Sequence, residues 1–335
     1  ILNIGRIKLA AGVMGAAKAT ITESVKYANE REQFGRVISK YGAIRYKLAE
    51  QAIRTFVVES GTYRAGQNID DAIQGYIADG MDKSEATLKG IELFAPECAV
   101  LKVAGSDCLD FVVDEAVQIY GGMGYSAESS VERGYRDSRI NKIFEGTNEI
   151  NRLLTVDMIL RRAMKGELDL MGPAMKVASE LMSIPETVEK QEGALANETQ
   201  YIQGFKKSIL MVAGAAVQKL MQSMAKEQEV LMNIADMSIW TYMAESSLLR
   251  VQQMIDLKGE DACAAQIAIV KTYFYDSADK INKAGKDAIG SFAEGDELRM
   301  MTMGLKRFTK TETINVKESR QLIASKIIEA NKYCF

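Results

Sequence analysis

Proline is scarce in this chain, and that scarcity constrains its fold more than any other feature. The 335 residues contain three prolines, Pro96, Pro173 and Pro185. Because proline breaks helix interiors, long stretches of the chain can continue as helices. Apolar residues recur there at helical spacings, and the first such stripe is Ala10, Met14, Ala17, Ile21, Val25 and Ala28. The pattern predicts an all-α protein.

Glycine-rich segments divide the predicted helices. We predict helices over residues 84–103 and 109–120, separated near Gly105, and one long loop from Gly121 to Gly146. Helix resumes at Thr147 or Asn148 and continues to about Lys165. The next segment carries two glycines and ends at Pro173, which marks a domain boundary. We therefore expect a first helical domain over residues 1–165, a linker over 166–172 and a second helical bundle over 173–335, with a last helix near 316–331.

Composition narrows the functions open to the chain. A net charge of −3 provides no single-sign field for binding nucleic acid or an anionic membrane. No stretch approaches the ~20 apolar residues of a transmembrane helix. The four cysteines lie far apart, so they indicate neither a disulfide framework nor a zinc site and favour a reducing compartment. Histidine is absent, so no metal site is predicted and acid–base chemistry falls to a carboxylate, lysine, tyrosine or cysteine.

The segment with the most chemical information is Phe144-Glu145-Gly146-Thr147-Asn148-Glu149-Ile150-Asn151-Arg152. It places a carboxylate before a glycine and a hydroxyl residue at a predicted helix start. The free backbone N–H groups of a helix start suit a phosphate or pyrophosphate, to which Thr147 can add its hydroxyl. The same residues are also consistent with an ordinary helix N-cap preceded by an acid that favours the helix dipole.

Four motifs in order along the chain together resemble the acyl-CoA dehydrogenases. Phe144–Arg152 is similar to the family's signature around its catalytic glutamate, and Arg136–Ile140 matches the R-D-x-R-I before it. Tyr27–Gly35 contains an R-x-x-F-G element, and Gln118–Tyr125 is similar to a Q-x-x-G-G-x-G loop. The resemblance covers residues 1 to about 165. It implies the family's carboxy-terminal four-helix bundle, followed here by a further helical bundle.

The resemblance also assigns roles to individual residues. Glu145 is the implied catalytic base. The implied cofactor-binding residues are Arg31, Phe34, Gln118, Gly121, Gly122, Thr147 and Glu149. The implied substrate-binding residues are Arg6, Phe144 and Gly146. Arg31, Phe34 and Gln118 are expected to contact the flavin of a neighbouring subunit, although each of them can also be an ordinary residue at a helix end. Arg6 can equally be a surface charge.

Three further positions bear on this resemblance. Some relatives carry the catalytic glutamate on the first helix, about where Gly5 stands, so Glu145 has no rival in this chain. Glu149 occupies a position where some relatives have glutamine. Phe144, together with the extra helical bundle, resembles the very-long-chain branch of the family.

The activity implied is FAD-dependent α,β-dehydrogenation of fatty acyl-CoA thioesters in fatty acid β-oxidation. Reoxidation would use an electron-transferring flavoprotein, and the enzyme would be a homodimer or tetramer in the bacterial cytoplasm or, in a eukaryote, the mitochondrial matrix. An acyl-CoA oxidase and a non-catalytic helical assembly module are the alternatives. The sequence lacks the family's amino-terminal helical and middle β domains. We therefore expect an inactive fragment that binds FAD weakly or not at all.

Overall fold

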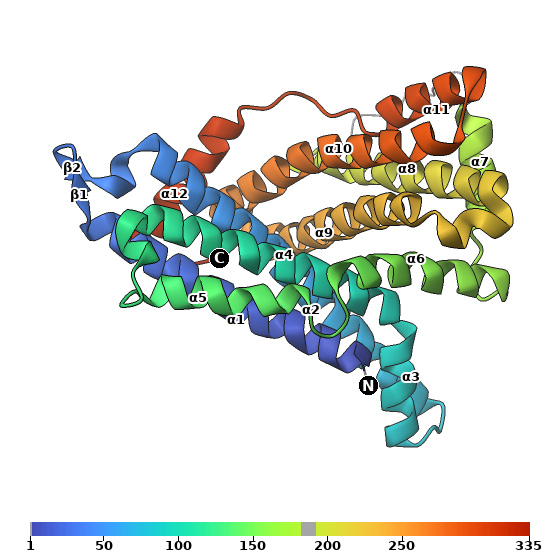
Figure 1. Cartoon of the computed structure of the whole chain (residues 1–335), viewed down its shortest axis with the longest axis horizontal. Helices are drawn as coiled ribbons and strands as arrows, with labels where there is room; N and C mark the ends of the chain where they lie inside the picture. The colour runs from blue at the N-terminus through green and yellow to red at the C-terminus, as the bar shows by residue number, and fades with distance from the viewer. Residues whose placement is uncertain (1, 182–191) are drawn as a thin grey trace.

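The computed structural model describes residues 2–181 and 192–335, and helices form nearly all of this part of the chain (Figure 1). The first six α-helices are α1 (Leu2–Glu30), α2 (Gly42–Ala78), α3 (Lys83–Leu93), α4 (Ala95–Tyr120), α5 (Ser130–Ser138) and α6 (Asn148–Met164). The others are α7 (Met171–Leu181), α8 (Ala196–Leu220), α9 (Gln228–Lys258), α10 (Ala264–Phe292), α11 (Gly295–Phe308) and α12 (Val316–Ala330). The predicted all-α class is confirmed.

Short elements complete the described chain. A two-stranded antiparallel hairpin, β1 (Glu32–Gln33) and β2 (Arg36–Val37), pairs Glu32 with Val37 and projects from one end of the molecule (Figure 1). The 3₁₀ turns are Ile38–Lys40, Gly121–Tyr125, Arg139–Lys142, Met221–Lys226 and Asp261–Cys263. Residues 1 and 182–191, with Pro185, lie outside the described residues.

Small residues let α1 and α4 pack closely together. Ala10 and Ala17 on α1 are fully buried. A Cβ atom added at Gly105 of α4 would lie 3.0 Å from Val13 Cγ2 and 3.4 Å from Ala10 Cα. Gly105 therefore permits a close helix–helix approach, and the predicted helix break at this glycine is wrong because α4 runs through it.

The segment from Gly121 to Gly146 is largely helical, so the predicted long loop is also wrong. It contains the 3₁₀ turn Gly121–Tyr125, then α5, then the 3₁₀ turn Arg139–Lys142. The predicted helix from Asn148 is confirmed, with Thr147 as its N-cap. Helix α6 thus begins just after the segment that contains Glu145.

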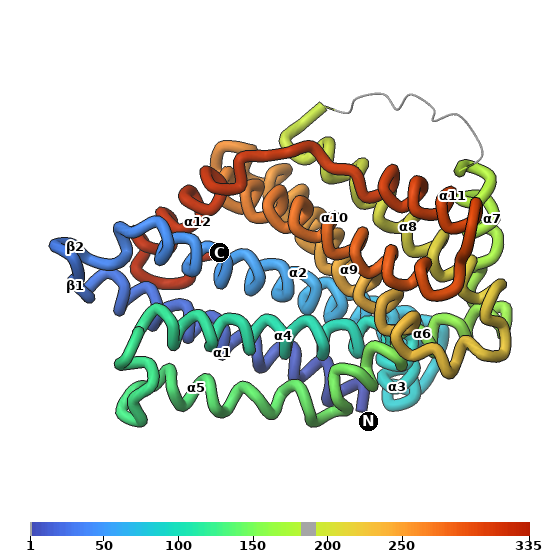
Figure 2. The backbone as a smooth tube through the Cα atoms, turned by 45° about the horizontal axis from the view of Figure 1, so that its top comes forward, coloured from blue at the N-terminus to red at the C-terminus, as the bar shows by residue number. Residues whose placement is uncertain are grey.

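The later helices pack against the earlier ones through one continuous core. Helices α8, α9 and α10 share a centre in which Phe205 stacks on Phe274 with ring centroids 5.8 Å apart. Helix α9 also contacts α2 and α6, and α12 returns to pack on α2 (Figure 2). Helices α8 to α11 are called the second bundle below. The domain boundary at 166–172 stays a prediction, and α7 begins at Met171 and includes Pro173.

Candidate active site

Glu145 lies in a sharp backbone bend immediately before α6. Glu145 and Gly146 both have positive φ angles, +57° and +85°, and a non-glycine residue rarely adopts this conformation. The bend turns the Glu145 side chain toward α1. A Cβ atom added at Gly5 would lie 2.4 Å from Glu145 Cδ and 2.4 Å from Oε2. The carboxylate thus occupies space that any larger residue at position 5 would fill.

Two buried side chains hold the backbone of this bend. Arg6 Nε donates a hydrogen bond to the Glu145 carbonyl at 3.3 Å. Asn151 Nδ2 donates to the carbonyls of Glu145, Gly146 and Thr147 at 3.3, 2.8 and 3.0 Å. Arg6 is 4% exposed and Asn151 is fully buried, so both are fixed by packing. The alternative that Arg6 is a surface charge is wrong, and its role toward substrate stays a prediction.

Burial also shifts the pKa values of Arg6 and of its neighbour Cys98. Loss of solvent lowers the pKa of Arg6, while the neighbouring Cys98 and Glu145 act in the opposite direction. Burial, assisted by Glu97, raises the pKa of the Cys98 thiol to about 12. Cys98 is therefore a neutral, unreactive neighbour of Arg6 at physiological pH.

The first turn of α6 is capped from within the chain. The Thr147 hydroxyl accepts a hydrogen bond from the Ile150 N–H at 3.4 Å. Hydrogen bonds from its own backbone N–H and from Thr147 lower the pKa of the Glu149 carboxyl. Glu149 is exposed and Phe144 is 46% exposed, so both side chains reach the surface beside the bend.

A buried lysine, which the sequence analysis missed, also contacts this turn. Lys102 on α4 is fully buried and donates to Asn148 Oδ1 at 2.7 Å. Asn148 Nδ2 in turn donates to Ser106 Oγ at 2.9 Å and Asp107 Oδ1 at 3.0 Å. Burial lowers the pKa of Lys102 to about 8, against the opposing effect of the nearby Asp107 and Glu149 carboxylates. The lone charge within Val100-Leu101-Lys102-Val103-Ala104 is the signal that could have identified it.

The other predicted cofactor residues gather at the far end of α1. Phe34 forms the hairpin tip with φ +53° and is 91% exposed. The Tyr41 hydroxyl donates to the carbonyls of Gln33 and Phe34 at 2.8 and 3.1 Å, which fixes the tip. Arg31 is exposed beside it. The hairpin thus exposes an arginine and an aromatic ring at one end of the molecule.

The glycine turn after α4 lies at this same end. Tyr27 stacks on Tyr120 with ring centroids 4.0 Å apart, which joins the end of α1 to the end of α4. Gln118, Gly121 and Gly122 are exposed, and Gly121 has φ +59°. A Cβ atom at Gly121 or Gly122 would meet no described atom within 4 Å, so the space beside the backbone is open there.

The predicted site residues thus form two groups. The base group contains Arg6, Phe144, Glu145, Gly146, Thr147 and Glu149. The hairpin group contains Arg31, Phe34, Gln118, Gly121 and Gly122. The two groups lie near opposite ends of α1, whose 29 residues at ~1.5 Å each span about 43 Å (Figures 1 and 2). One chain does not bring the two groups together.

No described helix is long and apolar enough to cross a membrane. No group of three or more cysteine, aspartate or glutamate side chains in residues 2–181 and 192–335 is arranged to hold a metal ion. The chemical group at this site is the Glu145 carboxylate, on a backbone bend held by Arg6 and Asn151.

Comparison with known proteins gives the family. Two family models, both described as "Acyl-CoA dehydrogenase, C-terminal domain", match residues 1–160 and 204–307. A "Probable acyl-CoA dehydrogenase" of Bacillus subtilis is 40% identical over 334 residues, 99% of this chain and 56% of that protein. The human mitochondrial very long-chain specific acyl-CoA dehydrogenase is 39% identical over 178 residues, 52% of this chain and 24% of that protein. The chain thus spans about half, or less, of these relatives.

Solved structures agree with this result. The crystal structure of an acyl-CoA dehydrogenase complexed with FAD from Bacillus anthracis superposes with a TM-score of 0.96 at 40% identity, over 100% of this chain and 57% of that one. Acyl-CoA oxidase 3 of Yarrowia lipolytica superposes with a TM-score of 0.68 at 16% identity, which shows a shared fold. By family models, sequence and structure, this chain belongs to the acyl-CoA dehydrogenase family.

Proposed function

We propose that this chain is the carboxy-terminal helical part of a longer FAD-dependent enzyme that desaturates fatty acyl-CoA thioesters between Cα and Cβ. The observation that carries the proposal is the Glu145 geometry. A carboxylate lies in the space beside Gly5, on a bend held by Arg6 and Asn151. Such preorganisation suits a general base, which must be fixed near the proton it removes.

In this proposal Glu145 removes the substrate α-proton. FAD, when bound, accepts the β-hydrogen together with its electron pair. Negative charge develops on the thioester carbonyl oxygen and must be stabilised by a hydrogen-bond donor. Backbone N–H groups commonly donate such hydrogen bonds. The Glu145 N–H makes no hydrogen bond to any described residue, so it is available to the thioester carbonyl.

The surfaces of this chain fit FAD in two places. In the hairpin group, the exposed Arg31 guanidinium can donate two hydrogen bonds at once to a pyrophosphate. The open space beside Gly121 and Gly122 would let the cofactor approach the backbone. The base group offers the Thr147 hydroxyl at the start of α6. Because the two groups lie near opposite ends of α1, we propose that two copies of the chain complete each site. The FAD complex of the Bacillus anthracis relative supports the choice of cofactor.

The biological setting is part of the same proposal. We place the enzyme in fatty acid β-oxidation in a bacterial cytoplasm, with an electron-transferring flavoprotein as acceptor; the two Bacillus relatives support a bacterial source. The chain by itself is proposed to be inactive and to bind FAD weakly, because it spans 56% of its Bacillus subtilis relative. The missing part would supply the remaining contacts to the flavin ring.

The decisive experiment is Glu145→Gln in the longer enzyme. The amide preserves shape and loses the base, so turnover of a saturated acyl-CoA should fall by roughly 10²–10⁴-fold while FAD content is retained. The matched control is Glu85→Gln, since Glu85 is an exposed partner of Lys89 on α3. Near-normal turnover of Glu145→Gln would remove Glu145 from the mechanism.

The electron acceptor is tested separately. The reduced flavin should be reoxidised rapidly by electron-transferring flavoprotein and slowly by dissolved oxygen. Fast reoxidation by oxygen with stoichiometric hydrogen peroxide would assign the chain to an oxidase instead.

A further inference from the structure

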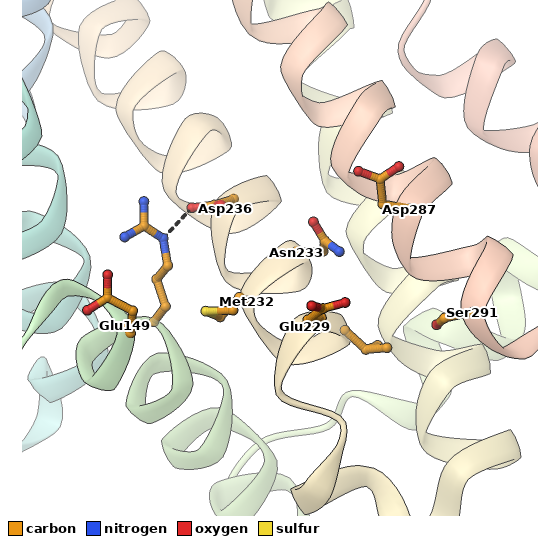
Figure 3. Close-up of a pocket in the computed structure, with 9 residues that line it drawn as sticks. Glu149, Glu229, Met232, Asn233, Asp236, Asp287 and Ser291 are labelled. Atoms are coloured by element: carbon orange, nitrogen blue, oxygen red, sulfur yellow. Dashed lines mark hydrogen bonds and ion pairs between the residues drawn. The ribbon is translucent and has the colours of Figure 1, made fainter.

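Arg152 connects the helix of the base group to the second bundle. Its Nε donates to Asp236 Oδ1 on α9 at 2.7 Å, and the dashed line in Figure 3 that ends at Asp236 marks this ion pair. Its Nη2 donates to Asp107 Oδ2 on α4 at 3.3 Å. One guanidinium therefore joins α6, α4 and α9, and its planar fork is suited to two carboxylates at once.

The residues beside Arg152 hold the Glu145 bend. Asn151, its neighbour in sequence, donates to the carbonyls of residues 145, 146 and 147. Asn148, one turn earlier, is held by Lys102 and Asp107. Any rotation of α6 about its axis would therefore move the Glu145 carbonyl relative to α1. An interaction that fixes the orientation of α6 therefore also fixes the position of the Glu145 carboxylate.

Open space adjoins this part of α6. A cavity of about 640 Å³ lies between the start of α6, the start of α9 and the end of α10 (Figure 3). Its lining is mostly polar and comprises Glu149, Arg152, Glu229, Val230, Met232, Asn233, Asp236, Asp287 and Ser291. The ion pair between Arg152 and Asp236 lies at the edge of this cavity and joins the first turns of α6 to α9.

We propose that Asp236 is a positioning residue for the Glu145 segment: by holding Arg152, it fixes the orientation of α6, so that the second bundle sets the geometry of the active site. This inference rests on the proposed function. The side chains of Arg152 and Asp236 are 20% and 34% exposed, so the pair is partly shielded from solvent, and Arg152 keeps Asp107 as a partner when Asp236 is removed. A small displacement of a catalytic group can nevertheless cost about 10²-fold in rate.

The structural arm of the test uses this chain itself. Asp236→Ala is compared with Glu245→Ala by amide hydrogen exchange. Glu245 is the control because it also lies on α9 and pairs with Arg64 at 2.9 Å and with Lys206, neither of which lies on α6. In Asp236→Ala, exchange in the peptide covering residues 143–151 should accelerate about fivefold. Glu245→Ala should leave that peptide unchanged and show a similar melting temperature.

The catalytic arm uses the longer enzyme. Asp236→Ala should lower kcat about tenfold with KM and FAD content unchanged. Arg152→Lys should act similarly, because an ammonium cannot bridge both carboxylates in the same geometry, and the double variant should be no worse than either single one. Equal behaviour of Asp236→Ala and Glu245→Ala in exchange and kcat would overturn the inference. An inactive wild-type enzyme would refute the proposed function, while the exchange result would still decide the positioning role.

Discussion

Glycine at position 5 leaves the space that the Glu145 carboxylate occupies. The carboxyl atoms lie 2.4–2.5 Å from where a Cβ atom at this position would be. Those atoms are the far end of a flexible side chain, so a larger residue at position 5 would displace the carboxylate and leave the helix intact. The position therefore separates an effect on geometry from an effect on folding.

This leads to a prediction for Gly5→Ala in the longer enzyme. Turnover should fall roughly 10–100-fold because the carboxylate is displaced, while FAD content and helicity stay normal. Gly12→Ala is the control, since Gly12 lies on the same helix and a Cβ atom there would meet nothing within 4 Å. Steady-state kinetics of both variants is the measurement. Equal activities would contradict the placement of the Glu145 side chain beside α1.

Among the residues of the candidate site, the sequence predicts some roles and misses others. Glu145 and the helix start at Asn148 follow from a local motif, because the signal is contiguous in the chain. Asn151 lies within the same motif, but its three hydrogen bonds depend on a left-handed bend that no spacing reveals. Lys102 reaches Asn148 from another helix, and such long-range side-chain pairing cannot be read from periodicity.

Two helical elements differ from the sequence-based prediction, each for its own physical reason. Gly105 suggested a helix end, yet it lies inside α4 because packing against Val13 requires a residue without a side chain. Helix α5 was hidden in the predicted loop because it is short and buries only Val131 and Ser138. Tertiary packing thus outweighs local propensity at Gly105, whereas α5 gives too short an apolar pattern to be recognised.

The contact between α4 and α6 yields a prediction about pH. Folding buries the charged form of Lys102 and lowers its pKa from 10.5 to about 8. Lys102→Met removes that charge, and Asn148 Oδ1 retains the Ser106 hydroxyl as donor at 3.1 Å. The variant should therefore unfold with a free energy about 1 kcal/mol higher than wild type near neutral pH.

The sign of the pH dependence follows from proton binding. Between the two pKa values of Lys102 the unfolded chain binds one proton more than the folded chain, so wild-type stability rises with pH from about 8 to 10.5. The advantage of Lys102→Met should shrink over this window. Urea unfolding of both proteins at about pH 7 and about pH 9.5 measures this difference in unfolding free energy. A difference that grows with pH would show that burial does not penalise the Lys102 ammonium.

At the scale of the whole molecule, α1 separates two groups of proposed ligand-binding residues. The bend before α6 lies near the first turn of α1, while the β1–β2 hairpin and the turn after α4 lie at its other end (Figure 2). The second bundle packs along α2 and α6 and joins the same core. The all-α class could be predicted from the sequence, but this separation and the role of the second bundle could not, because both depend on how the helices pack.

The most direct test of this account is complementation between two inactive variants of the longer enzyme. One variant carries Glu145→Gln and the other carries Arg31→Ala with Phe34→Ala. If each site takes its base from one chain and its hairpin from a partner, a mixed dimer contains one intact site and one site with both defects. Random pairing makes half of the dimers mixed, so coexpression should restore about a quarter of wild-type activity. Activity no higher than that of the separate variants, in a sample shown to contain mixed dimers, would contradict a site completed by two copies of this chain.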